Sequence, residues 1–123
     1  MEISVLLENY CLEKIGVHKH FKEEWNAHLY MIDSKYFIME TKDKEGRDIL
    51  TFKLNEFTNQ RLQKEYPKLV VPGYYCNKKL WSSVYVDQHP TNELIRDLVD
   101  ESYTALLSTF SKKRQEEISE GIL

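Results

Sequence analysis

Residues 27–41 read AHLYMI-DS-KYFIMET, and this stretch decides the fold class. Both halves are rich in aromatic and β-branched residues, which favour strands. The dipeptide Asp33-Ser34 between them is short enough to form a tight hairpin turn. The stretch therefore predicts two antiparallel strands at residues 27–32 and 35–41.

The segments on either side of the hairpin predict three more strands and three helices. Alternating side chains indicate the strands, and apolar residues that recur every three or four positions indicate the helices. Asn55 is placed to cap the second helix, and Pro67 ends it, while Thr91 begins the pattern of the third. The expected order is helix 2–15, loop 17–26, strands 27–32, 35–41 and 48–54, helix 56–66, strands 69–75 and 80–87, and helix 91–110.

Two segments have a weaker pattern. Residues 17–26 show no clear period and are interpreted as a loop that lays Phe21 and Trp25 onto the core. Residues 111–123 are expected to extend the last helix or to fray. Short connections favour antiparallel neighbours, so the chain is expected to be one domain, residues 1–123, of the two-layer α+β class α-β(3)-α-β(2)-α, with about five antiparallel strands covered by helices on one face.

Composition indicates a chain that folds without a membrane. Of its 123 residues, 41% are hydrophobic and 30% are charged, which is close to the globular average. No apolar run approaches the roughly 18 residues that a membrane helix needs. Met1-Glu2-Ile3 also lacks the basic start of a signal peptide. We expect a cytoplasmic protein with no membrane partner.

Cysteine and histidine spacing predicts neither a disulfide framework nor a metal site. Cys11 and Cys76 are far apart and form no CxxC motif, so both are interpreted as reduced thiols. His18 and His20 are the only close histidine pair, and no further ligands are anchored beside them. We expect no metal and no cofactor.

No catalytic constellation is found in the sequence. Cys76 lies near Lys78 and Lys79, which could lower its pKa, but a nucleophile also needs a positioned base. The motifs of phosphate-binding loops, zinc proteases and serine hydrolases do not occur. We therefore expect a protein that is not an enzyme.

One motif block resembles a known family. It runs through Tyr66-Pro67, Pro72-Gly73-Tyr74, Asn77-Lys78, Trp81 and Ser102-Tyr103. In order and spacing this block resembles the signature of the MmcQ/YjbR family. Inside the motif, Tyr75 stands where the family often has His, Cys76 where an aliphatic residue or Met is usual, and Leu80 where His often precedes the Trp.

The resemblance carries implications for fold and function. It implies a two-layer antiparallel α+β fold similar to type III secretion chaperones, and a "double-wing" DNA-binding protein. The net charge of −3 argues against a nucleic-acid partner unless the cations gather on one face. The alternative is a protein-interaction or adaptor module on the same fold, with no nucleic-acid role. The oligomeric state is left open.

The candidate nucleic-acid-binding residues are Tyr74, Asn77, Lys78, Lys79 and Trp81. Two cations, an amide and two aromatic rings within ten residues could hold phosphates and stack a base. The competing interpretation is that Gly73 serves a bend, the aromatic rings pack in or near the core, and the lysines keep a turn soluble. A second basic cluster, Lys112-Lys113-Arg114, is interpreted as a solvated helix end. DNA binding would require Lys78 and Lys79, together with Arg47 or Lys112, to converge on one face.

Overall fold

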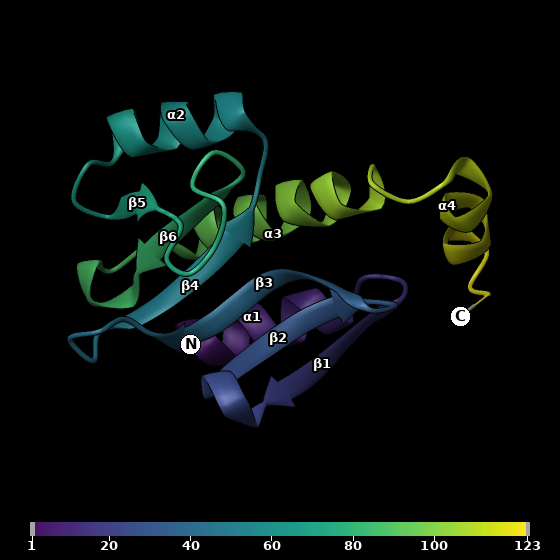
Figure 1. The fold of residues 1–123 in the computed structure, drawn as a ribbon, viewed down its shortest axis with the longest axis horizontal. Coiled ribbons are helices and arrows are strands. Elements are labelled where there is room, and N and C mark those ends of the chain that lie inside the picture. The colour runs from purple at the N-terminus through teal and green to yellow at the C-terminus, as the bar shows by residue number, and fades with distance from the viewer. Residues whose placement is uncertain (1, 123) are drawn as a thin grey trace.

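The computed structural model describes residues 2–122, and within them six strands form one antiparallel sheet (Figure 1). The order across the sheet is β1-β2-β3-β4-β6-β5. The strands are β1 (Val17–Lys22), β2 (Ala27–Ile32), β3 (Lys35–Lys42), β4 (Asp48–Lys53), β5 (Val70–Pro72) and β6 (Trp81–Tyr85). The helical elements of the same residues are α1 (Ile3–Leu12), η1 (Glu23–Trp25), α2 (Glu56–Glu65), η2 (Val86–Gln88), α3 (Asn92–Leu107) and α4 (Lys112–Ser119).

The predicted α+β class and antiparallel sheet are confirmed. The hairpin of β2 and β3 turns at Asp33, whose φ of 53° is the left-handed conformation that tight hairpin turns need. Asn55 accepts a hydrogen bond from the backbone N–H of Thr58, and Thr91 accepts one from that of Leu94. The predicted cap of α2 is therefore confirmed, and Thr91 caps α3 in the same way.

The prediction of a loop at residues 17–26 was wrong. Residues Val17–Lys22 form β1, which pairs with β2 along its whole length and brings the sheet to six strands. Phe21 and Trp25 were expected on the core, but both are exposed. The pattern was missed because β1 is an edge strand of partly exposed residues, in which charged side chains and histidines replace the apolar half of the alternation.

The two strands predicted at residues 69–75 and 80–87 are shorter than expected. Only Val70–Pro72 pair as a strand before the chain leaves the sheet, and β6 ends at Tyr85. The C-terminal segment neither extends α3 nor frays, because α4 is a separate helix capped by Ser111.

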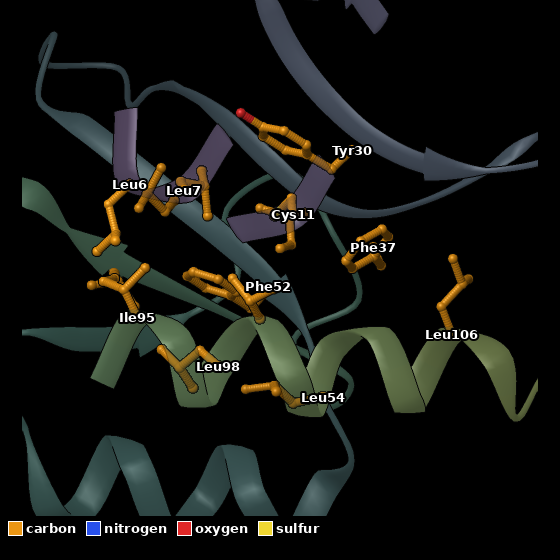
Figure 2. Packing of buried hydrophobic residues seen from close by; sticks show 14 of the residues in the cluster. Leu6, Leu7, Cys11, Tyr30, Phe37, Phe52, Leu54, Ile95, Leu98 and Leu106 are labelled. Carbon is orange, nitrogen blue, oxygen red and sulfur yellow. The ribbon is translucent and has the colours of Figure 1, made fainter. Parts of the chain in front are cut away.

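The main core lies on one face of the sheet, which we call the helix face and define by Tyr30, Leu50 and Phe52. Side chains of α1 and α3 pack there, and α1 is seen behind β2 and β3 in Figure 1. Figure 2 shows how Leu7 of α1 and Leu98 of α3 meet around Phe52. No helix within residues 2–122 has both the length and the apolar character that crossing a membrane requires.

The last helix is tied to the sheet at two points. Arg114 donates through Nε and Nη2 to the carboxylate of Asp33 at 2.9 and 2.8 Å, which joins α4 to the β2–β3 turn. The guanidinium lowers the pKa of Asp33 through these hydrogen bonds. Ile118 adds an apolar contact, since it is 1% exposed and belongs to the main core.

We predict that α4 contributes to global stability. Ile118→Ala should lower the free energy of unfolding by about 2–5 kcal/mol, because it leaves a cavity in the core. The matched control is Ile122→Ala, which removes the same atoms from a side chain that is 53% exposed. The control should change stability by less than about 0.5 kcal/mol. Equal urea midpoints for the two variants would contradict the prediction.

Candidate functional site

The second face of the sheet carries the candidate site. We call it the loop face and define it by Met39, Thr51 and Ser83, which are cross-strand partners on β3, β4 and β6. A small cluster of Ala27, Leu29 and Met39 is buried on it. The loop of residues 73–80 between β5 and β6 crosses this face, and Figure 1 shows it in front of β4. The sequence motif thus forms a cover over the sheet.

Gly73 fixes where this loop starts. Its N–H donates to the carbonyl of Trp81 at 2.9 Å, and a side-chain carbon at position 73 would lie 2.6 Å from Cβ of Trp81. Any side chain would collide there with a strand residue that cannot move away. The glycine therefore allows the loop to fold back tightly against β6.

Two further contacts hold the loop against the sheet, and two more lie within the loop itself. The N–H of Tyr74 donates to Ser83 Oγ at 2.9 Å, and the Tyr74 and Tyr85 hydroxyls lie 2.9 Å apart. Lys78 Nζ donates to the Gly73 carbonyl at 3.2 Å, and Asn77 Oδ1 accepts from the N–H of Lys79 at 2.9 Å. These contacts give a local structural role to three of the five predicted site residues: Tyr74, Asn77 and Lys78.

Trp81 does not present its ring to solvent. It is 8% exposed on β6, and its ring centre lies 5.2 Å from that of Tyr36. Its position favours the packing interpretation over base stacking. Asn77, Lys78 and Lys79 are exposed, so their proposed contact with nucleic acid stays a prediction.

Sequence reasoning missed the cation–aromatic pairs of the loop face. Lys22 Nζ lies 3.7 Å from the ring centre of Trp25, and Lys53 Nζ lies 5.3 Å from that of Trp81. Two further pairs are Arg47 over Tyr85 at 3.5 Å and Lys78 over Tyr74 at 5.9 Å. The partners of Lys53–Trp81 and Arg47–Tyr85 are distant in sequence, and the pairing of β4 with β6 brings them together. Lys22–Trp25 and Lys78–Tyr74 are local pairs, three and four residues apart. The nearest signal in the sequence was Lys22 three residues before Trp25.

The other predicted features lie apart from the loop. Lys112 is on α4, which Figure 1 places at the far end of the molecule from the β5–β6 loop. His18 and His20 are exposed on β1. Within residues 2–122, no group of three or more histidine, cysteine or acidic side chains is arranged to hold a metal.

The thiol of Cys76 is not activated. Burial raises its pKa, and its nearest polar partner is the Tyr36 hydroxyl at 3.7 Å. Burial also raises the pKa of Tyr36 to about 12, so this hydroxyl stays protonated near neutral pH and offers no general base. Cys11 of α1 is fully buried in the main core, and burial raises its pKa to about 12.

We predict that Gly73→Ala destabilises the protein by about 1–3 kcal/mol, because the new methyl group overpacks the contact with Trp81. The measurement is the urea midpoint, read together with tryptophan fluorescence in a Trp25→Phe background, where Trp81 is the one remaining of the two tryptophans. A variant with the stability and emission of the wild type would show that the loop does not approach β6 as described.

We predict slow alkylation of both thiols in the folded protein. A raised pKa leaves less thiolate at a given pH, and the thiolate is the form that reacts. At pH 8, iodoacetamide should modify Cys76 more slowly in the folded protein than in urea. It should modify Cys11 only in urea. Peptide mass spectrometry measures both rates. Reaction of Cys76 at the rate of the unfolded chain would contradict this expectation.

Comparison with known proteins places the chain in a family. The model of the YjbR family matches residues 12–105. The chain is 29% identical to the uncharacterized protein YjbR of Escherichia coli K12 over 115 residues, which cover 94% of this chain and 95% of that protein. It is 28% identical to the uncharacterized protein YbdF of Escherichia coli O157:H7 over 93 residues, covering 76% of this chain and 75% of that one.

Two solved structures share the fold. A Deinococcus radiodurans protein with a DUF419 domain superposes with a TM-score of 0.85 at 22% identity, covering 97% of this chain and 89% of that one. A Pseudomonas syringae protein superposes with a TM-score of 0.65 at 17% identity, covering 83% of this chain and 96% of that one. Together with the family match over residues 12–105, which include the motif at 66–103, this shows that the chain belongs to the YjbR family.

Proposed function

We propose that this chain is a non-catalytic, cytoplasmic DNA-binding protein that contacts its ligand with the loop face. The observation that carries the proposal is the set of four cation–aromatic pairs on this face: Lys22–Trp25, Arg47–Tyr85, Lys53–Trp81 and Lys78–Tyr74. Cations neutralise phosphates, and an exposed aromatic ring such as that of Trp25, which is 47% exposed, can stack on a base. The rings of Tyr85 and Trp81 are buried, so their part is to hold Arg47 and Lys53 in place. A surface that holds both suits a nucleic-acid strand.

The distribution of charge supports the proposal despite the net charge of −3. Of the five lysines on the six strands, Lys22 and Lys53 contribute to this face through Trp25 and Trp81. Lys19 pairs with Glu8 of α1, and Lys35 lies over Phe110. Glu40 accepts a hydrogen bond from Ser4 of α1, so it belongs to the helix face. The loop of residues 73–80 adds two lysines and no carboxylate. The loop face is therefore locally basic.

The cations of this face differ in how free they are to bind phosphate. Arg47 is held by Asp87 through two hydrogen bonds of 2.8 Å, and Lys42 by Asp48 at 2.7 Å. Within residues 2–122, no carboxylate lies within ion-pair distance of the other four cations, which are Lys22, Lys53, Lys78 and Lys79. We assign phosphate contacts to these four lysines.

A protein-interaction module is the second candidate, and one feature favours it. Strand β1 is at an edge of the sheet, and its outer backbone groups are free to pair with a strand from a partner. Its exposed Phe21 would add an apolar contact. This module needs no basic surface, so the dependence of binding on salt separates the two candidates.

We predict salt-sensitive binding of fluorescent duplex and single-stranded DNA. Lys78→Ala/Lys79→Ala should reduce the slope of log affinity against log salt by about 1.4 to 1.8, the value of two lost phosphate contacts. The matched control is Lys64→Ala/Lys113→Ala, which removes two exposed lysines from α2 and α4 and should leave the slope unchanged.

Two outcomes would decide against the proposal. One is no salt-dependent binding by wild-type protein at micromolar concentration, which would leave the protein-interaction module ahead. The other is an equal loss of slope in the control, which would show that DNA contacts the helices as much as the loop face.

A further inference from the structure

The loop face contains a pocket with aromatic walls, which we call the aromatic pocket. It has a volume of about 420 Å³ and is lined by Trp25, Tyr36, Met39, Thr41, Lys42 and Tyr75. This volume falls in the range of about 300–1,000 Å³ that small-molecule sites occupy. Met39 and Tyr36 come from β3, Trp25 comes from η1, and Tyr75 comes from the loop. Three segments distant in sequence thus converge on one cavity.

Tyr75 is held over this pocket in an unfavourable backbone conformation. Four non-glycine residues among those described have a positive φ, and three of them, Asn26, Asp33 and His89, are of types that tolerate it. The fourth is Tyr75, with φ of 63°. A bulky side chain in this region costs conformational energy, and such residues concentrate at functional sites. The conformation keeps a ring that is 59% exposed at the wall of the pocket.

The pocket offers stacking surface but few free hydrogen-bonding groups. Thr41 Oγ1 donates to the carbonyl of Asn26 at 3.0 Å, and the Tyr75 hydroxyl donates to that of Lys42 at 3.3 Å. The Tyr36 hydroxyl lies against Cys76 at 3.7 Å. With its hydroxyls engaged, the pocket is suited to a flat apolar ring and poorly suited to a sugar or another ligand rich in hydroxyl groups.

The charges around the pocket select an anionic ligand. Lys42 lines the cavity, and Lys22 Nζ lies 3.7 Å from the ring centre of Trp25. These two ammonium groups would repel a cation that entered an otherwise suitable aromatic cage. Lys42 Nζ forms an ion pair with Asp48 Oδ1 at 2.7 Å, so Lys22 is the less restrained of the two lysines. The ligand therefore combines a planar ring with a negative charge.

We propose that the aromatic pocket binds one unstacked nucleotide, with its base against Trp25 and Tyr75 and its phosphate toward Lys22. This inference rests on the proposed DNA-binding function and specifies the part of the ligand that the pocket recognises. Every base has a flat face, so stacking without hydrogen-bond readout is tolerant of sequence. A base inside a duplex cannot reach the pocket, so the site favours single strands.

The test measures binding of single-stranded oligothymidine, and of an abasic oligomer of the same length, at low salt. Wild-type protein should bind the abasic oligomer roughly 5- to 150-fold more weakly, the value of one stacked base. Trp25→Ala and Tyr75→Asn should each weaken binding of oligothymidine within the same range and leave binding of the abasic oligomer unchanged. Asparagine suits the backbone at position 75, so this variant should melt no lower than wild type.

The matched control is Phe57→Ala, which removes a ring that is 75% exposed on α2 and lies outside the pocket. It should bind both oligomers like wild type. Trp25→Ala and Tyr75→Asn could instead weaken binding of both oligomers equally, or leave binding of both unchanged. In either case the pocket does not hold a base, and the inference is overturned while DNA binding stands.

A free nucleotide separates failure of the inference from failure of the proposed function. Thymidine monophosphate should quench the emission of Trp25, and Trp25→Phe should remove this quenching, because Trp81, the second of the two tryptophans, is buried. Quenching without any oligonucleotide binding would support the pocket as a nucleotide site and overturn the DNA-binding function. If neither the nucleotide nor oligothymidine quenches this emission, the proposal that the pocket binds a nucleotide is overturned.

Discussion

The close approach of Gly73 to Trp81 is the constraint on which the loop face depends. The backbone at position 73 lies against β6 with no room for a side chain. This contact directs the following residues across the sheet instead of into solvent. Tyr74 can then reach Ser83 and Tyr85, and Tyr75 can reach the aromatic pocket. The family motif therefore determines the path of the loop, and this path positions the side chains that form the candidate site.

The path of the loop explains why cationic and aromatic side chains lie together on one face of a chain whose net charge is negative. On this face the strands contribute Lys22 and Lys53, and the loop contributes Lys78 and Lys79. Lys22 and Lys53 lie over the rings of Trp25 and Trp81. A ring face attracts a cation and also shields part of its stem from water. The arrangement keeps the ammonium groups at defined positions without pairing them to carboxylates.

Sequence reasoning predicted the fold well where one local pattern decided it. The hairpin at Asp33, the cap at Asn55 and the long helix after Thr91 all follow from side chains within a few residues of each other. It failed at β1, where an edge strand does not need the apolar alternation of a central strand. It also placed Trp25 in the core, because an aromatic residue beside a predicted loop gives no sign of which surface it faces.

For the candidate site, the sequence predicted the segment but not the partners. The motif located the loop of residues 73–80, and packing of Trp81 was one of the two interpretations considered. The aromatic pocket could not be inferred, because its walls come from η1, β3 and the loop. The pairing of β2 with β3, of β3 with β4 and of β4 with β6 brings these segments together.

The strand order has a consequence for how the protein folds. Strands β1 to β4 are neighbours in sequence and in space, so each pairing closes only a short loop. Strand β6 must return past α2 and β5 before it can pair with β4. Closing a longer loop is entropically more demanding and delays non-local pairing. We expect a meander of four strands to assemble first and the covered face to be completed late, so that folding intermediates expose Met39 and its neighbours to solvent.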